Sequence, residues 1–156
     1  MLRRILSVFR PPQPAGPQQT LRTFRDSSHP IDAAAMTAEQ GGWRFDASGP
    51  RTLHLFEIPN PSIEQCLLVY RARIRSENLA NKAYLEMWCR FPGQGEFFSR
   101  GLNQTVHGTT GWATYETPFY LKKGQRPDLL KLNLVLEGAG TMWIKDVELL
   151  QTPLEG

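Results

Sequence analysis

Hydrophobic and polar positions alternate over short segments of this chain from Trp43 almost to its C-terminal end. In the clearest run, four leucines alternate with mostly polar side chains: Leu130, Leu132, Leu134 and Leu136. A period of two places all four leucines on one face of an extended strand. The glycines at 138 and 140 then suit a tight connection before the next apolar run. Residues 111–149 therefore predict three consecutive strands.

Similar segments fill the chain after residue 42, and no long stretch has a helical period. Proline, glycine and asparagine separate nearly all of them, as at Ser48-Gly49-Pro50 and Pro59-Asn60-Pro61. About eight short strands in one domain predict an all-β fold, an antiparallel β-sandwich and most simply a jelly roll. The expected strands are 43–46, 52–58, 66–75, 84–91, 96–100, 112–121, 130–137 and 141–150.

The chain before these strands has a different composition. Residues 1–19 are basic and rich in proline and glutamine, which predicts a flexible tail. An alternative for its first turns is a short amphipathic helix lying on a membrane surface. Its apolar side chains have helical spacing among arginines: Leu2, Ile5, Leu6 and Phe9. Residues 20–42 are expected to be a polar lead-in that contains one alanine cluster, Ala33 to Ala35, and forms either a short helix or a segment that wraps around the domain. Residues 43–151 are expected to form the sandwich and 152–156 a C-terminal tail.

The composition fits one domain with a tail, since 40% of the 156 residues are hydrophobic and 10% aromatic. The net charge is only +3 and the arginines are scattered, so no nucleic-acid partner is expected. No apolar segment is long enough to span a bilayer, which predicts a soluble domain. Both cysteines, Cys66 and Cys89, fall on the apolar side of their strands. They are expected to be two buried thiols, with a disulfide between them as the alternative.

The closing strands also resemble a known family. The residues that carry the resemblance are Trp112, Tyr115, Phe119 and Gly124, Leu132-Asn133-Leu134, Glu137-Gly138 and the run 140–149. They are similar to galactose-binding-domain-like jelly rolls, a group that includes many carbohydrate-binding modules. The resemblance implies a noncatalytic binding domain and a structural calcium ion near Asp146 and Glu148. Lys145 departs from the pattern because it replaces an acid, which makes such a calcium site less anionic. No other cofactor is expected.

The predicted order makes strands 84–91 and 130–137 neighbours, so that their outward faces combine. Aromatic rings beside hydrogen-bonding side chains suit a sugar, because the ring stacks on the pyranose and the polar groups bind its hydroxyls. The alternative is that the N-terminal segment or the loop 101–111 covers the rings. The expected ligand-binding residues are Tyr84, Glu86, Trp88, Arg90, Lys131 and Asn133.

The sequence carries no nucleophile elbow, phosphate-binding glycine loop or zinc spacing, so an enzyme is not expected. The leading interpretation is a noncatalytic carbohydrate-binding-like module. The alternative is a protein-interaction or sensor domain of the same fold without sugar affinity. That domain would use the loop rim at 98–111 or the alternating arginines Arg71, Arg73 and Arg75, which are equally typical of a solvated strand face.

Overall fold

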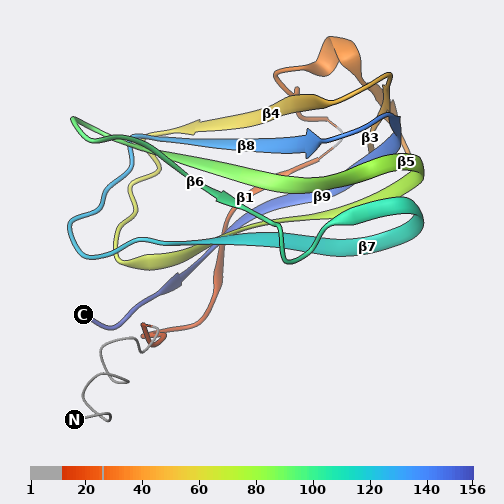
Figure 1. Ribbon diagram of the computed structural model, residues 1–156. Helices are drawn as coiled ribbons and strands as arrows, with labels where there is room; N and C mark the ends of the chain where they lie inside the picture. The colour runs from red at the N-terminus through yellow and green to blue at the C-terminus, as the bar shows by residue number, and fades with distance from the viewer. Residues whose placement is uncertain (1–11, 26) are drawn as a thin grey trace.

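The computed structural model describes residues 12–25 and 27–156, and all described strands join one antiparallel sheet of nine strands (Figure 1). The predicted membrane-surface helix falls on residues 1–11, outside the described part of the chain. The strands are β1 (Gln19–Phe24), β2 (Thr37–Glu39), β3 (Gly42–Ala47), β4 (Arg51–Pro59), β5 (Cys66–Phe91), β6 (Gly95–Arg100), β7 (Val106–Tyr120), β8 (Leu129–Leu136) and β9 (Gly140–Pro153). A single turn of 3-10 helix, Ala33–Ala35, precedes β2.

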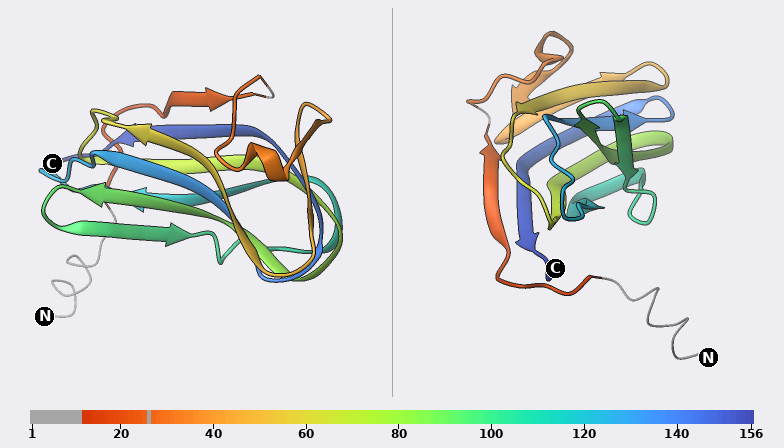
Figure 2. Two further views of the ribbon diagram at one scale, coloured as in Figure 1. Left: turned by 90° about the horizontal axis from the view of Figure 1, so that it is seen from above. Right: turned by 90° about the vertical axis from the view of Figure 1, so that its left-hand side faces the viewer.

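The sheet curls into two layers because β5 runs through both of them (Figure 2). The first half of β5 pairs with β9 and β7, and its second half pairs with β8 and β6. The sequence predicted two separate strands, 66–75 and 84–91, and this prediction is wrong. Between them the chain bends at Asn78 and Asn81, which adopt positive φ angles of 51° and 61°, and β5 folds over the end of the sandwich and runs back in the other layer without a break in the strand (Figure 1).

One hydrophobic core lies between the layers. The four alternating leucines of β8 are at most 1% exposed, and the inward side chains of both halves of β5 are buried with them. The prediction of an antiparallel β-sandwich is therefore confirmed. The pairing of Glu86 with Asn133 also confirms that strands 84–91 and 130–137 are neighbours.

The polar segment before Trp43 contributes more to the sheet than its pattern indicates. β1 pairs with β9, and β2 forms a hairpin with β3. Residues 13 and 15 exchange backbone hydrogen bonds with residues 155 and 153, so this part of the chain lies along the C-terminus. Edge strands bury little side-chain surface, and a largely polar segment can therefore be extended and paired. Within the described residues, no helix has the length and apolar character needed to cross a membrane.

Cys66 and Cys89 are both buried and free, as the first interpretation of their positions predicted. Burial raises the pKa of the Cys66 thiol to about 11. Burial, with a contribution from Cys66, raises that of Cys89 to about 12. Both thiols are thus protonated and weakly nucleophilic at neutral pH.

Candidate functional site

The outward face of the β4–β8–β5–β6 layer is hollowed, with a volume of about 680 Å³. Strand alternation supplies most of its walls, because residues whose neighbours enter the core must point outward. In β4 the pairing register shifts between His54 and Phe56, so Leu55 and Phe56 both face inward and His54 and Glu57 both face out. The hollow is lined by Ile31, Thr52, His54, Glu57, Glu86, Trp88, Glu96, Arg100, Lys131 and Asn133.

A row of polar side chains crosses the floor of the hollow, one from each strand. His54, Asn133, Glu86 and Arg100 are cross-strand neighbours in this order. Asn133 Nδ2 donates to Glu86 Oε1 over 3.1 Å, and Arg100 Nε donates to Glu86 Oε2 over 2.9 Å. His54 Nδ1 lies 3.3 Å from Asn133 Oδ1. Since the Asn133 amide nitrogen already faces Glu86, its oxygen is the acceptor and His54 carries the proton on Nδ1.

Glu86 is the centre of this row, although it is only 5% exposed. Its carboxylate accepts a third hydrogen bond from Trp88 Nε1, over 2.8 Å. Burial alone would raise the pKa of this carboxyl group. The hydrogen bonds from Asn133, Trp88 and Arg100, with the charge of Arg100, outweigh burial and lower the pKa below its usual value. Glu86 is therefore a buried anion that holds the Trp88 ring in place.

The lowered pKa predicts how Glu86 contributes to stability at different pH values. A carboxyl group with a depressed folded-state pKa stabilises the fold above its unfolded-state pKa, and this contribution is lost as the pH falls through the folded-state value. We expect the unfolding free energy of the wild type to drop more steeply than that of Glu86→Gln between about pH 5 and pH 2. Urea titrations at each pH measure this difference. Parallel profiles would contradict an anionic Glu86.

Trp88 and its neighbour Phe98 form the aromatic part of the site. Their strands pair directly at these two residues, and the ring centroids lie 5.0 Å apart at 53°. The Trp88 ring is half-buried and lines the hollow, while Phe98 is 49% exposed beside it. The Arg100 guanidinium lies 4.2 Å from the centre of the Phe98 ring. A fixed indole at the wall of a polar hollow is suited to stacking on a flat apolar ligand face.

The described part of the N-terminal segment does not fill this hollow. β1 lies in the other layer, next to β9. Only Ile31 of residues 12–25 and 27–42 lines the hollow, at its rim. Ile31 and Asp32 donate backbone hydrogen bonds to the free edge of β4, which anchors the rim there. The polar loop expected at 98–111 is shortened to residues 101–105 between β6 and β7.

The structure does not bring all six predicted ligand-binding residues into the hollow. Glu86, Trp88, Lys131 and Asn133 line it, and Lys131 Nζ pairs with Glu96 over 2.8 Å. Tyr84 is on the same face but is only 6% exposed, and its hydroxyl lies 3.5 Å from Glu137. Arg90 lies outside the lining, in a two-bond ion pair with Asp128. Neither Tyr84 nor Arg90 is therefore placed to contact a ligand in the hollow.

Among the residues of this site that the sequence did not predict are His54, Phe98 and Arg100. The last two have a simple signal, since Glu96, Phe98 and Arg100 alternate along one short strand. His54 is harder to find because the register shift in β4 breaks the period of two. The expected calcium ion has little support from the geometry around Asp146, whose side chain is exposed. Within residues 12–25 and 27–156, no group of three or more His, Cys, Asp or Glu side chains is suited to hold a metal ion.

Known protein-family models and curated proteins show no match to this chain, whereas solved structures do. The CBM22-1 xylan-binding domain of Paenibacillus barcinonensis Xyn10C superposes with a TM-score of 0.53 at 11% identity, over 89% of this chain and 98% of that domain. The C-terminal family 22 carbohydrate-binding module of Clostridium thermocellum Xyn10B gives 0.50 at 10% identity, over 90% and 84%.

A structure of infectious bursal disease virus strain Gx also matches, with a TM-score of 0.50 at 13% identity, over 90% of this chain and 34% of that one. The fold is therefore a jelly roll of the kind found in carbohydrate-binding modules, as the resemblance implied. Because the virus structure contains the same architecture, the fold alone does not identify a ligand. The side chains of the hollow must supply that part of the inference.

Proposed function

We propose that this protein is a noncatalytic carbohydrate-binding module that holds a glycan in the hollow of the β4–β8–β5–β6 layer. The observation that carries the proposal is the Trp88 ring, which lines the hollow and is fixed by its hydrogen bond to the buried Glu86. A ring fixed before binding loses little conformational entropy when a sugar stacks on it.

The polar lining supports a neutral ligand. Three carboxylates line the hollow with two cationic side chains, so neither sign of charge dominates. Glu86 and Arg100 bind each other, as do Lys131 and Glu96. His54 and Glu57 are exposed at the β4 side, where they are available to bind hydroxyl groups. The similar structures include a xylan-binding domain, which supports a glycan as the ligand class.

The proposal predicts that Trp88→Ala loses glycan binding while the domain stays folded. The loss of a central aromatic contact is expected to weaken binding about 30-fold or more. A glycan array identifies the oligosaccharide, and calorimetric titration of wild type and variant measures the change. Trp112→Ala is the matched control, because Trp112 is also half-buried but lies in β7, outside the lining of the hollow. It should bind the oligosaccharide as the wild type does.

Two results would contradict this function. One is an array on which the wild type binds no glycan, and this would favour a protein-interaction domain of the same fold. The other is equal affinity of the wild type and Trp88→Ala for the oligosaccharide that binds, which would show that the ligand binds at another surface of the protein.

A further inference from the structure

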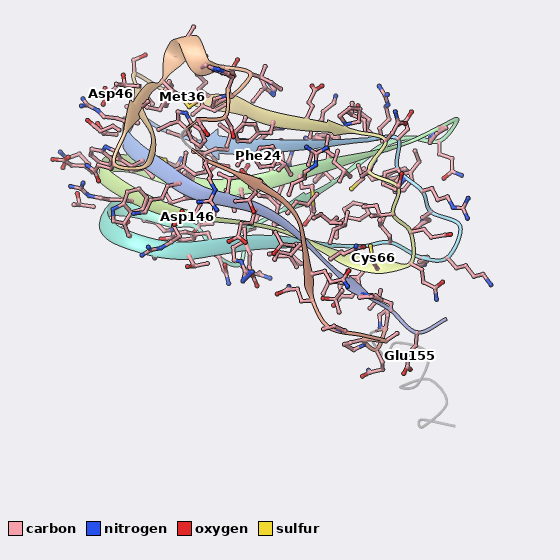
Figure 3. All side chains as sticks on the ribbon, turned by 180° about the vertical axis from the view of Figure 1, so that it is seen from behind. Phe24, Met36, Asp46, Cys66, Asp146 and Glu155 are labelled. Atoms are coloured by element: carbon pink, nitrogen blue, oxygen red, sulfur yellow. The ribbon has the colours of Figure 1, made fainter. Side chains whose placement is uncertain are left out.

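A second hollow, of about 470 Å³, lies on the outer face of the opposite layer. It shares no lining residue with the Trp88 hollow. Figure 3 views this side of the molecule, with Phe24 on β1 and Asp146 on the neighbouring β9. The lining is strongly polar and comes from three strands, β5, β7 and β9, and the end of β1: Thr23, Phe24, Arg25, Arg71, Arg73, Thr114, Asp146 and Glu148.

A β-bulge in β9 shapes this hollow. Arg73 pairs with Lys145 and Arg71 with Glu148, so Asp146 and Val147 together face a single residue of β5. Asp146 adopts a φ angle of 51°, in the left-handed region that non-glycine residues rarely occupy. Val147 still enters the core, and Asp146 is left exposed on the outer face. Bulges of this type redirect side chains and are frequent beside binding sites.

Arg71 and Arg73 line this hollow, and their guanidinium groups form no side-chain hydrogen bond with residues 12–25 or 27–156. Neither forms an ion pair with any residue in the described ranges, and Arg71 Nε is buried without a hydrogen-bond partner there. Arg75, two positions further along the same face, differs. Its guanidinium lies 4.3 Å from the centre of the Trp143 ring and donates to Gln40 over 3.2 Å. A buried guanidinium N–H favours an acceptor from outside the chain.

The side chains of the lining indicate which chemical group this acceptor is. A guanidinium group binds a carboxylate in a planar, two-bond arrangement. Asp146 and Glu148 on the β9 side are acceptors for hydroxyl groups and disfavour a ligand with several negative charges. The hydroxyl groups of Thr23 and Thr114 complete the rim. A ligand with one carboxylate and neighbouring hydroxyls matches this arrangement.

We infer that the Arg71–Arg73 hollow is a second glycan site, which binds the carboxylate of an acidic sugar such as a uronic acid. The inference goes beyond the proposed function, because this site lies on the opposite layer and needs neither Trp88 nor Glu86. A chain with both sites would bind a neutral segment on one face and an acidic residue on the other.

Titration of the full chain with an oligosaccharide that carries a single uronic acid residue, compared with a neutral oligosaccharide of equal length, tests the inference. The acidic oligosaccharide should bind, and the Arg71→Gln/Arg73→Gln double variant should weaken its affinity about tenfold or more, as expected for the loss of charge-assisted hydrogen bonds. Arg75→Gln is the control, since it removes one arginine from the same face of β5 outside the lining of the hollow. It should leave the affinity unchanged. Thermal unfolding of each variant checks that the fold is retained.

Three results would overturn the acidic-sugar site. They are the absence of any preference for the singly acidic oligosaccharide over the neutral one, an equal loss in Arg75→Gln, and inorganic phosphate binding as tightly as the acidic oligosaccharide. The second result would indicate diffuse charge attraction, and the third a general oxyanion site. Trp88→Ala separates the two proposals, because it should keep binding to the singly acidic oligosaccharide even though it loses the ligand of the other hollow.

Discussion

Glu86→Ala is expected to lower the free energy of unfolding by about 3 kcal/mol, because it removes one partner of a buried ionic network. The substitution leaves three donors without their acceptor, Trp88 Nε1, Asn133 Nδ2 and Arg100 Nε. It also releases the indole ring from its position at the wall of the hollow. Glycan affinity should therefore fall together with stability. Urea unfolding measures the first effect and calorimetric titration the second.

Glu57→Ala is the control for Glu86→Ala. Glu57 lines the same hollow and carries the same charge, but it is exposed and forms no ion pair or side-chain hydrogen bond with residues in the described ranges. Its replacement should change the unfolding free energy by less than about 0.5 kcal/mol. Similar stabilities for Glu86→Ala and Glu57→Ala would show that the network contributes nothing to the fold.

The parts of the fold that sequence predicted are those where one strand face is buried and the other exposed. The leucines of β8 alternate without interruption, so their inward direction and the outward direction of Lys131 and Asn133 follow from period two. The same rule placed Glu86 and Trp88 outward on β5. Four of the six predicted ligand-binding residues line the hollow for this reason.

The places where the structure departs from the sequence pattern have different physical causes. Tyr84 points outward from β5 as the alternation predicts. It pairs with Val135 near the end of β8, however, and its hydroxyl lies beside Glu137, so neighbouring residues bury the ring. Alternation along one strand does not reveal burial by a neighbouring strand. Asn78 and Asn81 look like turn residues, yet their left-handed conformations fold β5 from one layer into the other without ending the strand. β1 buries little surface and carries no alternating pattern. In each case a tertiary contact decides a structure that local sequence leaves open.

Gly138→Ala is expected to destabilise the protein by about 3 kcal/mol, at the upper end of what overpacking costs. Gly138 lies in the connection between β8 and β9, where the chain meets the bend of β5. A Cβ atom there would overlap the carbonyl oxygen of Ala80 and lie 2.7 Å from its carbonyl carbon. Both are backbone atoms in a segment held by hydrogen bonds from Ala80 N to Ala139 O and from Glu137 N to Lys82 O. Relief of the overlap therefore requires backbone movement.

Gly49→Ala is the control, because an added Cβ at Gly49 meets no atom within 4 Å. Its stability should be close to that of the wild type, and an equal loss in both variants would exclude the overlap as the cause. The connection at Gly138 also fixes β8 against β5, and hence Asn133 beside Glu86. Gly138→Ala should consequently weaken glycan binding as it weakens the fold, whereas Trp88→Ala should weaken binding alone. That contrast separates the residues that support the hollow from the one that contacts the sugar.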